Sequence, residues 1–503
     1  MAIKELIVVL AIALVVFAAA RPVVIRFLAP ETFDRRRAVW IVLTVTAFLV
    51  PSFWFYVAVA GPLMAWLAKR DDNPQALLLA LFLVVPPIAF KVPFPGLNYA
   101  FELNQLRLFS LFVIVPWLLT YLGDPANAGK RWNLADTFLC LLLLIQIVFL
   151  IPYEDLTNTI RRSIVTVLDS FAVLYFMSRM AATRAKLVDV LLVLCLVGAI
   201  YALLAVFESL RSWMLYGSLY ERWGHLADLW NLRDGRLRAP VSAGHPLTLG
   251  YVLAMAFCFW LWFRGKVDDR WRWMAGAAVL LAGLLATNSR GPWLTAALAF
   301  VLVTFMTVTS LQQAFVRALA LVAVSVAVLL SPIGDSVVAK LPFIGEDEWG
   351  NVAYRVRLAE MSWQLVWRNP FFGDPFVIRQ MEALRQAQGI VDLVNAYATV
   401  ALFHGLVGLA LYLGIFLYAL LHCWRRMLSW RRIDQDMQHL GIVLLAALVS
   451  TLFFMATAGF AIYQYALAGL LISYAAAPVG QVLRRTDRWA LDPARRPLRR
   501  GSR

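Results

Sequence analysis

The chain has 503 residues, of which 62% are hydrophobic, and its formal net charge at pH 7 is +16. Soluble domains are roughly half apolar, so this composition excludes a soluble globular protein and indicates a polytopic membrane protein. Most basic residues lie in short connections and the terminal tail, which indicates contact with membrane lipids rather than with nucleic acid.

Apolar stretches long enough to cross a bilayer follow one another along most of the chain. The first, 6–20, has the length of a signal peptide, but no A-x-A-like site stands out before Arg21, so we predict a retained helix. Pro51 leaves 38–68 as one long helix or two. The candidate spans are 5–20, 38–68, 76–90, 106–123, 134–151, 164–180, 187–210, 246–263, 272–286, 291–309, 314–331, 396–421, 440–457 and 459–477. We therefore predict an all-α, polytopic membrane helix bundle of about 12–15 transmembrane helices over residues 1–483.

Three strongly basic segments predict which face of the membrane each connection occupies. They are 264–272, 423–438 and the tail 484–503, and the positive-inside rule places all three in the cytoplasm. Counting spans back from the tail puts three polar segments on the outer face: 231–246, 287–291 and the long loop 332–395. The orientation of the N-terminus stays open, because Arg35–Arg37 reach the cytoplasm only if the N-terminus lies outside.

The outer loop 332–395 is predicted to be partly helical. One amphipathic helix begins with Asn351 as its N-cap and ends before Asn369-Pro370, and a second runs over 376–389 and ends at Gly389. These helices form a lid over the outer face, or they anchor the loop with Trp349, Trp363 and Trp367 at headgroup depth; the two interpretations are compatible.

Arginines on the outer face oppose the positive-inside trend and call for a local reason. Arg290 has no carboxylate within ten residues, so it either snorkels to lipid phosphate or binds something else. Arg238 follows Arg233 and Arg236, and Arg355 and Arg357 lie on the loop helix, where Glu360 can partly neutralise Arg357. Guanidinium groups pair bidentately with phosphate, so we expect a diphosphate ligand presented from the membrane.

Two residues are candidates for a general base. Asp392 is the carboxylate nearest the end of the loop and suits the role if burial raises its pKa. His245, at the mouth of a span, either caps or packs, or acts as the base. The sequence has no motif of P-loop ATPases, serine hydrolases or zinc proteases, and we predict neither a metal nor a cofactor.

Four outer-face segments resemble the O-antigen ligase and Wzy-type polymerase superfamily of bacterial surface-polysaccharide enzymes. They are "LRAPVSAGHPLTLGYVLA", "ATNSRGPWLTAALAF", "WQLVWRNPFFGDP" and "DLVNAYATVALFHGLVGLALYLGIF", and they appear in the family's order around one long loop, over about 230–420. The resemblance implies an undecaprenyl diphosphate-linked glycan as donor and a glycan or lipid A-core as acceptor. It also implies an active face on the periplasmic side of the bacterial inner membrane.

The resemblance further implies roles for individual residues. Arg238 and Arg290 match the family arginines that hold the diphosphate, and Asn395 and Tyr397 match positions that orient the loop or the acceptor. Ligases of this superfamily carry a histidine immediately before the asparagine, but Val394 stands there in this chain. This departure favours a polymerase over a ligase and leaves Asp392 or His245 as the base.

Two non-catalytic alternatives remain. A transporter of lipid-linked oligosaccharide also needs arginines and many spans, and a scaffold of a polysaccharide export complex could dock a partner through the tail 484–503. Convergence of the outer arginines beneath the loop would favour the enzyme, whereas arginines that point separately into headgroups would exclude it.

Overall fold

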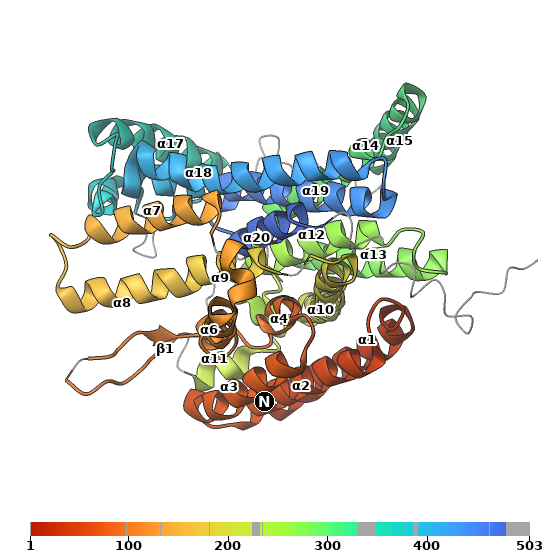
Figure 1. Cartoon of the computed structure of the whole chain (residues 1–503), viewed down its shortest axis with the longest axis horizontal. Helices are drawn as coiled ribbons and strands as arrows, with labels where there is room; N and C mark the ends of the chain where they lie inside the picture. The colour runs from red at the N-terminus through yellow and green to blue at the C-terminus, as the bar shows by residue number, and fades with distance from the viewer. Residues whose placement is uncertain are drawn as a thin grey trace, which may run out of the picture.

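The computed structural model describes residues 2–96, 98–130, 132–180, 182–223, 232–233, 235–329, 349–385, 391–461 and 463–478. The described chain is almost entirely helical, which confirms the predicted fold class (Figure 1). The helices before the first outer arginines are α1 (Ala2–Val24), α2 (Pro30–Leu49), α3 (Phe53–Arg70), α4 (Pro74–Leu81), α5 (Gln105–Phe109), α6 (Val115–Gly123), α7 (Leu134–Val148), α8 (Leu156–Thr166), α9 (Ala172–Ser178), α10 (Arg184–Arg211) and α11 (Gly217–Arg222). The later helices are α12 (Pro246–Trp262), α13 (Arg270–Ala286), α14 (Arg290–Met306), α15 (Leu311–Leu329), α17 (Trp349–Arg368), α18 (Ala396–Trp430), α19 (Gln435–Ala458) and α20 (Gln464–Ala475).

Short non-α segments join some of these helices. The π-helical turns η1 (Ser110–Ile114) and η3 (Val167–Phe171) connect α5 to α6 and α8 to α9. The described residues also form two antiparallel hairpins, β1 (Phe90–Lys91) with β2 (Glu102–Leu103) and β3 (Leu232–Arg233) with β4 (Arg236–Leu237), and the 3-10 helices η2 (Pro125–Lys130) and η5 (Val241–Ala243).

Five of the described helical segments are long and apolar enough to cross a membrane. They are α1, the segment Gln105–Gly123, α10, α18 and α19, and α7, α12, α14 and part of α15 are shorter apolar helices. The break at Pro51 is confirmed, because α2 ends at Leu49 and α3 begins at Phe53. The predicted span 76–90 is wrong: α4 ends at Leu81, and the chain leaves the helix before Pro86-Pro87, which cannot continue it.

The described polar connections gather at two ends of the bundle, which we call the basic end and the loop end. At the basic end, Lys266 pairs with Asp436 across 3.1 Å, so the segments 264–272 and 423–438 lie together as predicted. At the loop end, the amide of Ala239 donates to the carbonyl of Ala286 at 3.3 Å, which joins the two arginine-bearing segments around 238 and 290. The predicted proximity of the segments in each of these two pairs is therefore confirmed, and the tail 484–503 lies outside the described residues.

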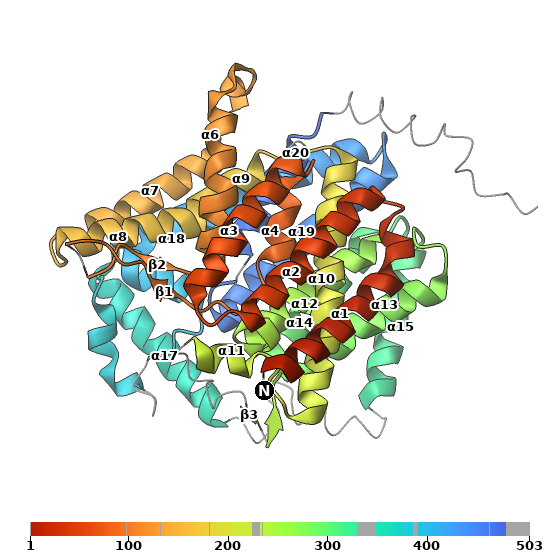
Figure 2. The same ribbon diagram turned by 90° about the horizontal axis from the view of Figure 1, so that it is seen from below.

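The same contacts orient the first helix, which the sequence leaves open. Near the start of α1, the Ser218 amide donates to the Glu5 carboxylate at 3.4 Å, on the α11 segment at the loop end. Just beyond its other end, Arg26 pairs with Asp268 at the basic end. The N-terminus therefore lies at the loop end, beside α11 and β3 in Figure 2.

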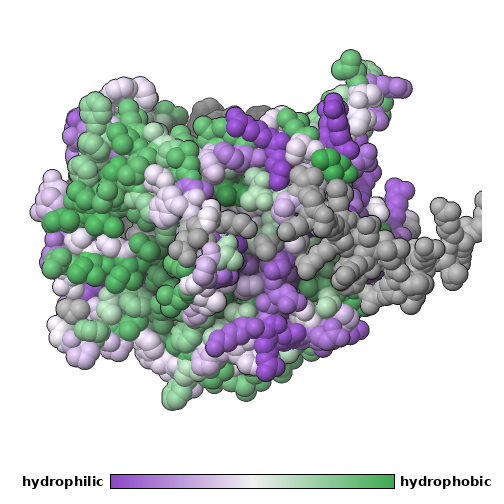
Figure 3. Space-filling view, viewed as in Figure 1, coloured by the Kyte–Doolittle hydropathy of each residue, from purple (hydrophilic) through white to green (hydrophobic). Residues whose placement is uncertain are grey.

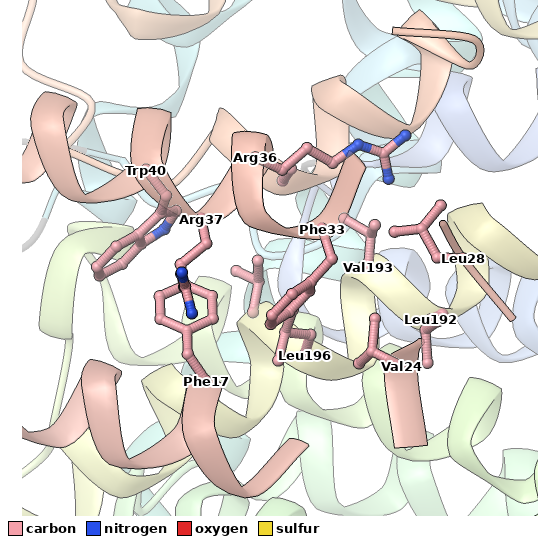
Figure 4. Close-up of a pocket in the computed structure, with 12 residues that line it drawn as sticks. Phe17, Val24, Leu28, Phe33, Arg36, Arg37, Trp40, Leu192, Val193 and Leu196 are labelled. Carbon is pink, nitrogen blue, oxygen red and sulfur yellow. The ribbon is translucent and has the colours of Figure 1, made fainter. Parts of the chain in front are cut away.

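A buried ionic cluster joins α2, α3 and α10 near the basic end. Arg36 binds Asp71 through Nε and Nη2, each at 2.7 Å, and Asp189 through Nη1 and Nη2 at 2.6 and 2.9 Å. Asn73 donates a further hydrogen bond to Asp189. Figure 4 shows Arg36 extending away from the apolar side chains around Phe33, so its charge is directed to the carboxylates and not into the neighbouring apolar cavity.

Helix α12 lies at the centre of the bundle and packs against α10, α13, α14 and α19. Nearly all of its residues are buried, which explains why it is hydrophobic all round. At the surface, by contrast, Figure 3 shows hydrophobic side chains over α7 and α8 and hydrophilic side chains on the other half of the same face. The N-terminus of the buried α12, and the arginines that precede it, lie at the loop end.

The outer loop contains one α-helix in its described part. Helix α17 begins at Trp349, so Asn351 is inside it and is not its N-cap, and it ends at Arg368, before Asn369-Pro370 as predicted. The second predicted helix is only the 3-10 helix η7 (Val377–Leu384). Segments 332–348 and 386–390, with the predicted end at Gly389, and the side chain of Trp349 lie outside the described residues. Trp363 and Trp367 are exposed on α17, as an interfacial anchor requires.

Candidate functional site

Arg238 lies where the β3–β4 hairpin leads into α12. The hairpin turns at Gly235, whose positive φ of 70° favours glycine. After the hairpin, Nη2 of Arg238 donates to Oγ of Ser289 at 2.9 Å. This hydrogen bond holds the Arg238 guanidinium against the residue that precedes Arg290.

Arg290 is the first residue of α14, after a turn of three residues. Asn288 has a positive φ of 43°, so this residue makes the reversal between α13 and α14. Pro292 is buried in the first turn of α14, where its fixed φ suits the helix, and a Cβ on Gly250 of α12 would lie 2.7 Å from its Cγ atom. The tight packing of α12 on this turn holds Arg290 in a defined place, with its Nε and Nη1 atoms buried.

Arg355 reaches the same region from the loop helix α17. Its Nη1 atom donates to the carbonyl of Thr457, near the end of α19, at 3.0 Å. On the other side of Thr457, a Cβ on Gly291 would lie 3.7 Å from Oγ1. The start of α14, the end of α19 and α17 therefore meet at Thr457, and Arg238, Arg290 and Arg355 gather around this meeting point.

Asp392 lies beside Arg355. The Tyr354 hydroxyl donates to the Asp392 carbonyl at 3.1 Å and accepts from the Asp392 amide at 3.0 Å. Although Asp392 and Arg355 are exposed by surface area, neighbouring atoms displace enough water to raise the pKa of Asp392, which the charge of Arg355 partly opposes. Desolvation also lowers the pKa of Arg355. A carboxylate with a raised pKa beside a guanidinium suits proton transfer.

Two predicted residues are not part of this group by the contacts described. Arg357 is exposed, and no ion pair with Glu360 is found among the described side chains. His245 is the N-cap of α12, and its Nδ1 atom accepts from the Leu247 amide at 3.1 Å. The capping alternative for His245 is thus confirmed, while its role as a base stays a prediction.

Asn395 and Tyr397 anchor the end of the loop. Asn395 is the N-cap of α18, and its side chain accepts from the amides of Tyr397 and Ala398 at 2.9 and 3.0 Å. The Tyr397 hydroxyl donates to the carbonyl of Leu452 in α19 at 2.7 Å. These bonds orient the segment that carries Asp392 and agree with a positioning role.

Helix α18 has a break at Gly405 that was not predicted from the sequence. There φ is 66° and ψ is −171°, and the segment 370–374 docks into the break. The amides of Leu406 and Val407 donate to the carbonyls of Pro370 and Phe371 at 2.7 and 3.2 Å. The signal was available in "NPFFGDP" and in a glycine in mid-span, but neither indicates by itself that the two segments meet.

The arrangement suits an anionic ligand. Arg238 bonds to Ser289, Arg290 begins α14, and Arg355 bonds to Thr457 beside Gly291. The three arginines therefore lie near the N-terminus of α14, where the helix dipole also favours negative charge. Within the described residues, no group of three or more histidine, cysteine or acidic side chains is placed to hold a metal ion.

Comparison with known proteins finds a family match for one part of the chain. No curated protein matches the chain. Residues 275–413, however, match the family model described as O-antigen ligase (Wzy_C). The match covers Arg290, Arg355, Asp392 and the docked segment 370–374, but begins after Arg238. This multi-pass membrane protein is therefore similar to the O-antigen ligase family over residues 275–413, which supports an enzymatic role in surface-polysaccharide biosynthesis.

Proposed function

We propose that this protein transfers a glycan from an undecaprenyl diphosphate-linked donor to an acceptor hydroxyl on the periplasmic face of the bacterial inner membrane. The observation that carries this proposal is the gathering of Arg238, Arg290 and Arg355 around Thr457 at one end of the bundle. Arginines that were only headgroup anchors would not need to meet from three separate segments.

In the proposed reaction, the bond between the sugar C1 and the diphosphate breaks, and a bond from the acceptor oxygen to C1 forms. The diphosphate leaves with the electron pair, and the arginines stabilise its growing charge without a metal or a nucleotide. Asp392 takes the proton of the acceptor hydroxyl, which its raised pKa favours. Helix α17 contributes Arg355 and covers the site, which limits hydrolysis of the donor by water.

A polymerase is the favoured form of this activity, and a ligase that transfers the glycan to lipid A-core is the alternative. Val394 replaces the histidine of the ligases, and Asp392, two residues earlier, supplies the nearest carboxylate. The matching family model, although described as O-antigen ligase, does not distinguish the two forms. The transporter and scaffold alternatives are less well supported, because neither explains why the outer arginines converge.

The test is glycosyl transfer by the purified full-length protein in lipid nanodiscs. A radiolabelled repeat unit on undecaprenyl diphosphate is supplied with and without lipid A-core, and products are separated by size. Chain lengthening without the core identifies a polymerase, and transfer only to the core identifies a ligase. If labelled donor is recovered unchanged under both conditions, the proposed function is wrong.

A further inference from the structure

A cavity between α7, α8 and α18 lies near the arginine group formed by Arg238, Arg290 and Arg355. Its volume is about 340 Å³, within the lower part of the range of ligand pockets. Gln146 of α7, Ser163 and Thr166 of α8, and His404 of α18 supply polar groups to its lining. No part of the reaction described above uses these side chains.

Aliphatic and aromatic side chains supply the remaining walls. Phe403, Phe460 and Tyr465 line the cavity, and Tyr412 contributes from α18. The Tyr412 hydroxyl donates to Oε1 of Gln464 at 3.1 Å, which fixes that wall. A lipid tail in the cavity would offer no hydrogen bond to Gln146 or His404, whereas a ligand with hydroxyl groups would.

Polar groups at the rim add to this supply. Arg162 lines the cavity and pairs with Oε1 of Glu154 at 2.7 Å. Glu154 itself does not line the cavity, so Arg162 is the charged side chain that a ligand at the rim would meet.

The cavity adjoins the arginine group through the end of α19. Phe460 lines it, only three residues after Thr457, whose carbonyl binds Arg355. Above it, Phe149 stacks on Phe372 with ring centroids 4.9 Å apart, so the docked loop segment forms part of its roof. A molecule in the cavity would therefore sit beside the place assigned to the donor diphosphate.

We propose that this cavity binds the glycan of the acceptor, an inference that rests on the proposed function. A sugar offers hydroxyl groups to Gln146, Arg162 and His404 and apolar C–H faces to the aromatic rings. The break at Gly405 directs the chain so that His404, one residue earlier, lines the cavity. The acceptor would reach the donor from the α7–α8 side, while the arginines hold the diphosphate from the α14 side.

Acceptor kinetics test this inference. The acceptor is an alkyl glycoside of the repeat unit, which cannot act as a donor because it has no diphosphate. Its concentration is varied at fixed radiolabelled lipid diphosphate-linked donor, with the full-length chain in nanodiscs. His404→Ala and Gln146→Ala should each raise the acceptor KM about three- to tenfold, the loss expected for one hydrogen bond, and leave the donor KM unchanged. Thr166→Trp fills the cavity and should raise the acceptor KM further.

A matched control is His422→Ala, which changes the same residue type on the same helix at the basic end. It should leave both KM values unchanged. Each variant is compared with the wild type by size-exclusion profile, and the Thr166→Trp variant tests the cavity without removing a hydrogen bond. Unchanged acceptor KM values in all three cavity variants would overturn this inference alone. Absence of transfer by the wild type would instead overturn the proposed function.

Discussion

Replacing Gly405 by alanine should undock the loop segment 370–374 from α18. The φ and ψ of Gly405, 66° and −171°, lie in a region that only glycine occupies readily. An added Cβ would also overlap the carbonyl group of Phe371. From the other side, a Cβ on Gly373 would lie 2.5 Å from the carbonyl oxygen of Leu402, so the two segments are in close contact at both glycines.

The magnitude follows from the backbone conformation at Gly405. That conformation costs about 1–3 kcal/mol for alanine in the docked state. The hydrogen bonds from Leu406 and Val407 to the loop carbonyls oppose undocking in the wild type and in the variant alike, so they do not add to the difference. The population with an undocked loop should therefore rise roughly five- to 150-fold.

Limited trypsin digestion measures this change at Arg368, the exposed end of α17 next to the docked segment. Cleavage of a transiently opened segment follows the open population when closing is fast, so the cleavage rate should rise in proportion. Glycosyl transfer should fall with it, because α17 carries Arg355. The control is Gly123→Ala, where a Cβ would meet nothing within 4 Å. Wild-type rates of cleavage and transfer in Gly405→Ala would refute this reasoning.

Three further predictions concern the arginine group and the packing of the bundle. Arg290→Ala should lower the transfer rate roughly 10²–10³-fold with normal membrane insertion, and Arg290→Lys should recover only part of the loss because lysine cannot bind bidentately; product formation and membrane fractionation check both. Asp392→Asn should abolish transfer. In the wild type the charge of Arg355 lowers the pKa of Asp392, so Arg355→Gln should raise that pKa and move the acidic limb of the pH–rate profile to higher pH. An unmoved limb would contradict this coupling. Arg36→Met leaves the buried carboxylates of Asp71 and Asp189 uncompensated and should lower the free energy of unfolding by about 3–5 kcal/mol. Asp34→Asn weakens the exposed pair between Asp34 and Arg37 and should lower it by less than about 1 kcal/mol. Thermal unfolding in detergent compares the two variants, and equal shifts in Tm would contradict the difference in burial.

Hydrophobic length and Pro51 were enough to predict most helices of the bundle. The failure at 76–90 shows the limit of that signal: the apolar run continues past Leu81, but the helix does not. Residues 82–85 stay buried outside a helix, so burial rather than helical conformation explains their hydrophobicity. Likewise, the second loop segment has helical periodicity, yet only a 3-10 helix forms over Val377–Leu384.

The grouping of the arginines was predictable only in part. Topology placed Arg238 and Arg290 at one end, and their meeting through Ser289 agrees with that expectation. The link from Arg355 to Thr457 depends on how α17 folds back over the end of α19, which no local pattern encodes. The break at Gly405 was missed for the same reason, because its partner segment lies 30 or more residues earlier in the chain.

The orientation of α1 bears on how the chain enters the membrane. With the basic end in the cytoplasm, as proposed, α1 inserts with its N-terminus translocated and its following arginines retained. Arg21 lies in the last turns of α1, Arg26 lies just beyond it, and Arg35–Arg37 lie in the first half of α2, so the retained side carries the stronger positive charge. The first hairpin, α1 with α2, can then form during synthesis, before the arginine-bearing segments of the loop end are made.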